Sequence, residues 1–143
     1  MKNIILTATV VLALATGKIM AQKVKNTDVP AAVKTALAKN YPKASGVSWE
    51  KEKGNFEANW GGRSKEDNSV VYTPEGKFVE MVVAIPVSSL PERVKSYVKQ
   101  HYPGAKITEA GKVTDAGGKI GYEAEVNHKD LVFSEGGEFI KVD

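Results

Sequence analysis

The hydrophobic positions of this chain follow two periods, and each period occurs twice. Apolar residues first recur every three to four positions, at 29, 33, 36, 37 and 41 and again at 90, 94, 97, 98 and 102, which is the spacing of a helix with one buried stripe. Downstream of each stretch, at 56–60 and 122–126, apolar and polar side chains alternate as in a strand with one buried face. The pattern predicts two copies of a helix followed by strands.

Residues typical of helix beginnings and helix ends flank both helical stretches. Pro30 and Pro91 fall in the expected first turn, where a missing N–H costs no hydrogen bond, and Asp28 and Ser89 precede them as expected N-caps. Each helix is expected to end at the Tyr-Pro pair that follows it, because the residue before a proline is excluded from the α region. Both helices therefore have a predicted beginning and end.

Four short antiparallel strands are predicted in each copy, with glycine-containing turns at 74–76 and 135–137 that suit tight hairpins. The segment 79–85 is nearly continuous in apolar residues, which favours a central strand where the two copies meet. We therefore expect the two copies to share one sheet. The predicted strands are 47–53, 55–61, 69–73, 77–85, 107–113, 120–127, 130–134 and 138–142.

The two copies form an internal repeat, since residues 29–34 return sixty-one positions later as residues 90–95. Two length differences interrupt the correspondence. The second copy has extra residues around 111–119, and the first has a longer loop at 61–68. Because the matching positions account for folding, specific function is predicted in the mismatched loop, which would insert into a partner's cleft. The alternative is a polar loop without that role.

Both copies carry the same motifs: a helix closed by Tyr-Pro-x-Ala, as in Tyr41 to Ala44, then a Phe/Tyr-Glu-Ala segment shortly after a glycine, then an apolar strand with a glycine turn. These motifs resemble the PepSY-like family of secreted bacterial proteins over 29–143. The resemblance implies an α+β fold similar to the β-lactamase inhibitor protein, with two tandem helix-plus-four-stranded meander repeats sharing one sheet. It also implies a non-enzymatic module that binds or inhibits a partner protein.

Two departures limit what the resemblance implies. The inhibitor protein is disulfide-bonded, whereas this chain has no cysteine. None of the inhibitor's contact residues can be matched here either. Inhibition of β-lactamase is therefore not carried over to this chain.

The N-terminal 21 residues are predicted to be a secretory signal peptide, with Lys2, an apolar stretch and a cleavage site before Gln22. The alternative is a retained N-terminal anchor. Residues 22–143 then form one domain, with repeats at 28–85 and 86–143, and the expected location is periplasmic or secreted with no membrane span after cleavage.

Loss of Lys2 and Lys18 lowers the net charge from +3 to +1, which argues against a nucleic-acid partner.

Residues able to carry catalysis are few. The only histidines, His101 and His128, have no spacing that would pair them as metal ligands, and no nucleophile, base and orienting group can be assembled. No catalytic residue, metal site or cofactor is predicted. A hydrolase is the least favoured function, and a periplasmic carrier of a small ligand or metal is the alternative to a protein-binding module.

The candidate partner-binding surface combines the polar face of the predicted sheet with the 61–68 loop. Alternation places acidic and amide side chains on one open face in both repeats, which is typical of a solvated sheet face or of a surface that meets a protein partner. Trp49, Trp60 and Tyr72 are interface anchors or core residues. The candidate residues are Glu57, Asn59, Gly61, Gly62, Arg63, Lys65, Asp67, Glu123 and Glu125.

Overall fold

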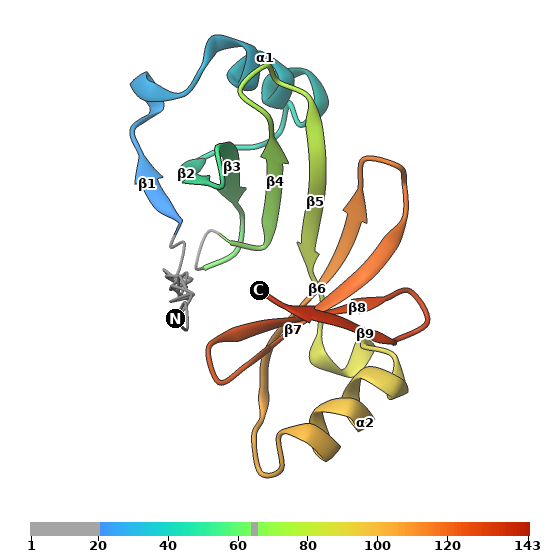
Figure 1. Ribbon diagram of the computed structural model, residues 1–143. Coiled ribbons are helices and arrows are strands. Elements are labelled where there is room, and N and C mark those ends of the chain that lie inside the picture. The colour runs from blue at the N-terminus through green and yellow to red at the C-terminus, as the bar shows by residue number, and fades with distance from the viewer. Residues whose placement is uncertain (1–20, 64–65) are drawn as a thin grey trace, which may run out of the picture.

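The computed structural model describes residues 21–63 and 66–143, so the predicted signal peptide lies outside the described residues except for Ala21. These residues form one antiparallel sheet of nine strands, in which each strand pairs with its neighbours in sequence (Figure 1). The strands are β1 (Gln22–Val24), β2 (Ser48–Glu52), β3 (Asn55–Trp60), β4 (Asn68–Tyr72), β5 (Phe78–Ala84), β6 (Ile107–Asp115), β7 (Ile120–Val126), β8 (Lys129–Ser134) and β9 (Phe139–Val142). The α+β architecture predicted from the repeats is confirmed.

Eight of these strands, β2 to β9, coincide with the predicted ones to within two residues at each end. The ninth, β1, was not predicted, because three mostly polar residues carry no readable period. It pairs antiparallel with β2, with Val24 opposite Trp49. The chain therefore adds one strand to the outer edge of the first meander.

The junction between the repeats lies at β5, as the apolar run at 79–85 predicts, because β5 pairs with β4 on one side and β6 on the other. The extra residues of the second repeat serve this junction. They extend β6 to Asp115, and residues 111–115 pair with residues 80–84 of β5. A length difference that reads as an insertion in the sequence thus joins the two repeats into one sheet.

The two helices, α1 (Ala31–Asn40) and α2 (Glu92–His101), begin differently from the prediction. Asp28 and Ser89 are not N-caps, because each closes a short 3-10 turn, Asn26–Asp28 or Val87–Ser89, that ends before the helix. Pro30 and Pro91 occupy the N-cap positions, and no side-chain capping hydrogen bond forms there. Both helices end at the residue before the Tyr-Pro pair, as predicted.

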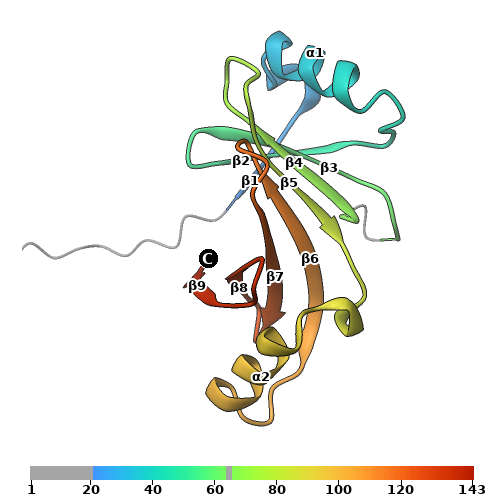
Figure 2. The same ribbon diagram turned by 90° about the vertical axis from the view of Figure 1, so that its right-hand side faces the viewer.

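Each helix covers its own hydrophobic core on the sheet (Figure 2). Under α1 the core contains Val29, Val33, Leu37, Trp49, Phe56, Ala58, Val70 and Tyr72. Under α2 it contains Leu90, Val94, Val98, Ala110, Ala124, Val126, Leu131 and Phe133. Trp49 and Tyr72 are buried and Trp60 packs against the first core, so these aromatic residues stabilise the fold and are not exposed anchors.

Both cores lie on the same face of the sheet. Val70 of the first core is opposite Met81, and Met81 is opposite Thr114 of β6. Thr114 and Ala110 of the second core are four residues apart on one strand, and side chains four apart in a strand point to the same face. The other face of the sheet carries neither helix.

The sheet coils so that its C-terminal end approaches the β2–β3 turn on the helix-free side. Lys53, in the turn between β2 and β3, lies 3.8 Å from the carboxylate of Asp143, which follows β9. Lys141 of β9 also contacts Asp143, at 2.6 Å. Figure 1 shows the C-terminal end of β9 between the two repeats. The helix-free face is therefore concave, and strands of both repeats surround it.

The β4–β5 turn packs directly on α1, which gives a test of this packing. Gly76 has a φ of +81°, and a Cβ there would stand 2.6 Å from the carbonyl oxygen of Ala32. Gly104 has nearly the same φ, +79°, and open space around it. We expect Gly104→Ala to lower the free energy of unfolding by about 1 kcal/mol through backbone strain, and Gly76→Ala by about 2–4 kcal/mol through strain and steric overlap. Urea denaturation of both variants checks this, and equal losses would show that the turn moves freely.

Candidate functional site

The acidic residues predicted on the open sheet face belong to the concave face. Glu57 alternates with the core residues Phe56 and Ala58 on β3, and Glu123 lies next to the core residue Ala124 on β7. Since both cores lie on the helix-covered face, both carboxylates point to the opposite one. The coiling of the sheet then turns these two carboxylates, from different repeats, toward a common space.

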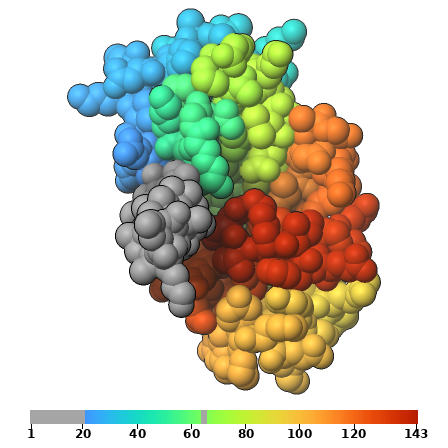
Figure 3. All heavy atoms as spheres, viewed as in Figure 1, coloured from blue at the N-terminus to red at the C-terminus, as the bar shows by residue number. Residues whose placement is uncertain are grey.

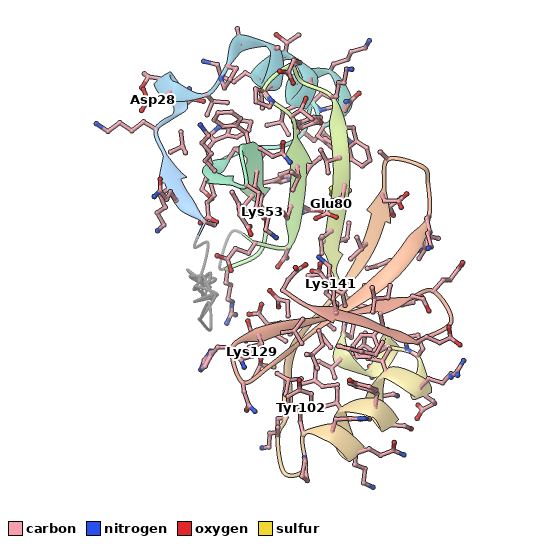
Figure 4. All side chains as sticks on the ribbon, viewed as in Figure 1. Asp28, Lys53, Glu80, Tyr102, Lys129 and Lys141 are labelled. Carbon is pink, nitrogen blue, oxygen red and sulfur yellow. The ribbon has the colours of Figure 1, made fainter. Side chains whose placement is uncertain are left out.

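That space is a cleft formed by two adjoining cavities of about 580 and 520 Å³. We call it the acidic cleft. In Figure 3 the C-terminal strands (red) lie directly below the strands of the first repeat (green), and in Figure 4 Lys53, Glu80 and Lys141 surround the middle of the molecule. The residues that line both cavities come from β2, β3, β4, β5, β7 and β8: Glu50, Glu57, Ser69, Val82, Glu123 and Asp130.

Glu123 is the most perturbed group of the acidic cleft. Its pKa is raised to about 7, first because burial removes water from the carboxylate and then because Asp130, Glu80, Asp143 and Glu57 add negative charge around it. All the charged neighbours that shift this pKa are themselves carboxylates. No positively charged side chain among the described residues of the cleft therefore offsets this negative charge at Glu123.

The pKa of Glu57 is also raised, because burial and the nearby Glu50 and Glu52 outweigh the hydrogen bonds that stabilise its charged form. The hydroxyl of Ser69 donates one of these hydrogen bonds. The coulombic effect of Glu57 on Glu123 links the first repeat to the second across the cleft. Two carboxylates that are far apart in sequence therefore share one electrostatic environment.

Further acids raise the negative potential. Burial is the main cause of the raised pKa values of Glu80, Glu109 and Asp130, and the positive charge of Lys141 partly opposes the effect at Glu80. Lys53 and Lys141 line one of the two cavities, beside Asp143. The cations thus gather at one side of the cleft, Glu109 extends its acidic lining on the other, and Asp130 lines both cavities.

The structure brings most of the predicted strand residues together. Glu57, Asn59, Glu123 and Glu125 all line the larger cavity. Asn59 is only 6% exposed, so it forms part of the floor. The hydroxyl of Thr108 donates a hydrogen bond of 2.6 Å to Glu125, which orients that carboxylate at the rim.

The 61–68 loop is placed only in part by the structure, because Lys65 lies outside the described residues. Asp67 lines the larger cavity, whereas Gly61, Gly62 and Arg63 do not. The backbone N–H of Ala84 donates to the carbonyl oxygen of Asp67 at 2.9 Å, which ties this end of the loop to β5. The described part of the loop thus contributes two acidic residues, Glu66 and Asp67, to the lining of the cleft.

Sequence reasoning missed further acids that line the cleft: Glu50, Glu52, Glu66, Glu80, Glu109, Asp130 and Asp143. A signal was present for Glu80, since it is the one charged residue of an otherwise apolar strand. Such a residue on a central strand must face a polar space. Glu109 and Asp130 sit near strand ends among other polar residues, and no sequence pattern distinguishes them from solvated positions.

Two further findings concern the described part of the chain. It contains no group of three or more His, Cys, Asp or Glu side chains arranged to hold a metal ion. Among the same residues, no helix is long and apolar enough to cross a membrane.

The family of the chain follows from its two repeats. The model of the family described as "Putative beta-lactamase-inhibitor-like, PepSY-like" matches twice, over residues 17–80 and 65–141. The chain belongs to the PepSY-like family. The double match corresponds to the two helix-and-meander units of this PepSY-like protein. A search of the curated proteins found no match.

Solved structures similar to this PepSY-like protein share its fold. A "putative periplasmic" protein from Bacteroides eggerthii DSM 20697 has a TM-score of 0.66 and 20% identity, with 80% of this chain and 88% of that one covered. A DUF2874 family protein from Bacteroides uniformis ATCC 8492 has a TM-score of 0.64 and 22% identity, with the same coverage. A BLIP-like protein from Bacteroides fragilis NCTC 9343 has a TM-score of 0.57 and 20% identity, covering 80% and 85%.

Proposed function

We propose that this PepSY-like protein is a non-enzymatic binding module of the periplasm or the secreted fraction, and that the acidic cleft receives a cationic segment of a partner protein. The observation that carries the proposal is the convergence of Glu57 and Glu123, one from each repeat, in a single cleft. The family description supports protein binding, and the periplasmic description of a similar structure supports the location.

In this proposal the negative charge of the cleft indicates the charge of the partner segment that it receives. The raised pKa values of Glu57 and Glu123 mean that their charged forms are poorly stabilised in the free protein. A lysine or arginine side chain that enters the cleft would supply the missing countercharge and lower both pKa values. Complementary charge of this kind gives specificity and speeds association more than it adds affinity. The expected partner therefore presents a protruding basic segment.

The 61–68 loop forms one side of this binding surface in the proposal. Asp67 adds a carboxylate to the cleft, and Arg63 is exposed beyond it. We propose that the loop contacts the same partner outside the cleft. This assigns the difference in length between the two repeats to recognition.

The experiment that tests the proposal is affinity capture from the native envelope fraction, followed by affinity measurement with the purified captured protein. The double variant Glu57→Gln, Glu123→Gln removes both charges at nearly constant volume. We expect it to bind at least about ten-fold more weakly, and we expect the affinity of the wild type to fall as salt rises. The matched control is Glu135→Gln, which removes an exposed charge in the β8–β9 turn, outside the lining of the cleft.

Equal affinity of the double variant and the wild type, or no dependence on salt, would show that the acidic cleft is not the binding surface. A second variant with the 61–68 loop shortened separates the loop from the cleft. If that variant alone retains full affinity, the loop has no part in recognition and the cleft assignment stands.

A further inference from the structure

The two edges of the sheet differ in a way that the acidic cleft does not explain. Within the described residues, four large hydrophobic side chains are exposed, and three of them belong to the edge strand β9: Phe139 at 37%, Ile140 at 54% and Val142 at 44%. The opposite edge, β1, is three residues long and exposes Gln22 and Lys23. A lysine on a short strand is a usual protection of a free edge, and β9 lacks that protection on its apolar side.

Phe139 and Val142 of β9 lie on the helix-covered face. Phe139 is opposite Phe133 and stacks on Tyr97 of α2 at 4.7 Å between ring centres, and Val142 is opposite the core residue Leu131. Lys141 is opposite Val132 and lines the acidic cleft, on the other face. The charge of Lys141 therefore does not shield the apolar side of the edge.

The outer edge of β9 also offers backbone hydrogen-bonding groups. The N–H of Asp143 donates to the carbonyl oxygen of Asp130 at 2.8 Å, so it points inward to β8. Because successive amides of a strand alternate in direction, the N–H of Val142 points outward. In the first repeat the equivalent strand, β5, pairs along residues 80–84 with β6, whereas among the described residues no strand pairs with the outer edge of β9.

We propose that β9 is a homodimerisation edge, at which β9 of a second copy pairs antiparallel and extends the sheet across a twofold axis. Antiparallel pairing of identical strands places the start of each beside the end of the other, so Phe139 of one copy meets Val142 of the second. The same register places Glu138 of one copy opposite Asp143 of the other, where Lys141 already contacts Asp143 within its own chain. A cavity of about 460 Å³ between α2 and Phe139 provides room for the incoming apolar side chains.

The chemistry of the two edges favours a closed twofold dimer over an open head-to-tail assembly of copies. A head-to-tail arrangement would pair β9 with β1, which is short, polar and contains Lys23. A twofold arrangement uses the apolar edge twice and leaves no free apolar strand, so that assembly stops at the dimer.

Sedimentation equilibrium of the purified protein over a range of concentrations tests the proposal. Val142→Pro removes the outward N–H without removing a bond of the β8–β9 ladder, and proline is tolerated on an edge strand in this orientation. Val142→Lys places a charge at the apolar contact. Each variant should dimerise at least about ten-fold more weakly than the wild type. The matched control is Val83→Lys, because Val83 is 40% exposed but belongs to β5, which is paired on both sides.

Circular dichroism spectra that match the wild type establish that the two edge variants remain folded. A concentration-dependent dimer that both edge variants weaken and Val83→Lys retains supports the proposal. A wild type that is monomeric at all concentrations overturns it, as does a dimer that either folded edge variant retains or that Val83→Lys also loses. None of these outcomes depends on the acidic cleft, so the proposed function and this inference fail separately.

Discussion

The protein is expected to become more stable as the pH falls from about 7.5 to about 5, with a gain of about 1–2 kcal/mol in the free energy of unfolding. The main cause is Glu123, whose pKa of about 7 in the folded protein stands above its ordinary value of 4.5. Between those values the folded state binds a proton that the unfolded state does not. Stability from this group is therefore fully present below pH 4.5 and is lost as the pH rises through about 7.

The size of the effect follows from the partial burial of Glu123. One pKa unit corresponds to about 1.4 kcal/mol, and contact with solvent reduces the full shift to about 1–2 kcal/mol. The raised pKa values of Glu57, Glu80, Glu109 and Asp130 act in the same direction. Carboxylates with lowered pKa values lose their stabilising contribution only below about pH 5, so a gain in stability between pH 7.5 and 5 identifies carboxylates with raised pKa values.

Urea denaturation at the two pH values, on the wild type and on Glu123→Gln, measures this dependence. The variant should be more stable than the wild type at the higher pH and should show a smaller gain on acidification. Glu135→Gln is the control for the loss of an exposed charge. A wild type that loses stability on acidification, or a Glu123→Gln variant with an unchanged pH dependence, would contradict the assignment.

Replacement of Phe133 by alanine is expected to lower the free energy of unfolding by about 3–5 kcal/mol, because it combines the loss of a large apolar side chain with the creation of a cavity. Phe133 is fully buried in the second core. Its ring packs edge-to-face against Tyr97 at 5.5 Å and Phe139 at 5.9 Å. Alanine would remove these contacts and leave a space that the sheet and α2 cannot close.

The same variant tests whether the two repeats unfold together. Both tryptophans, Trp49 and Trp60, lie in the first repeat, so their fluorescence reports on that repeat alone. Because β5 and β6 pair across the junction, we expect the fluorescence and circular dichroism transitions of Phe133→Ala to shift together. Fluorescence that keeps its wild-type midpoint while circular dichroism shifts would show that the repeats unfold independently. Phe139→Ala, at a 37% exposed position of β9, is the control, with an expected loss of about 1 kcal/mol.

The fold was predictable because its elements have strong local patterns. Alternation in segments such as 56–60 identified the strands, and the sixty-one-residue repeat supported each prediction with a second copy. The helix starts were predicted less well. A capping side chain at Asp28 and a 3-10 turn ending at Asp28 use the same local residues, and only the three-dimensional path distinguishes them.

The candidate site was predictable only within each repeat. Alternation placed Glu57 and Glu123 on an open face, but their approach to one another depends on the coiling of a nine-stranded sheet. Strand twist accumulates through every pairing, and no residue pattern records its sum. The same coiling turned a flat polar face into a cleft and raised the pKa of Glu123 by enclosing it.

The strand order of this sheet also bears on how the chain reaches its folded state. Every strand pairs with the strands next to it in sequence. Most of these pairs are hairpins that close short segments at little cost in chain entropy, and the two longer connections, β1 to β2 and β5 to β6, contain the helices. Folding rates fall as the mean sequence separation of contacts rises, and this order keeps that separation low for a β-rich protein. The contact between Lys53 and Asp143 is the main exception, because it joins the β2–β3 turn to the residue after β9. The concave face is therefore expected to close last, after both meanders have formed.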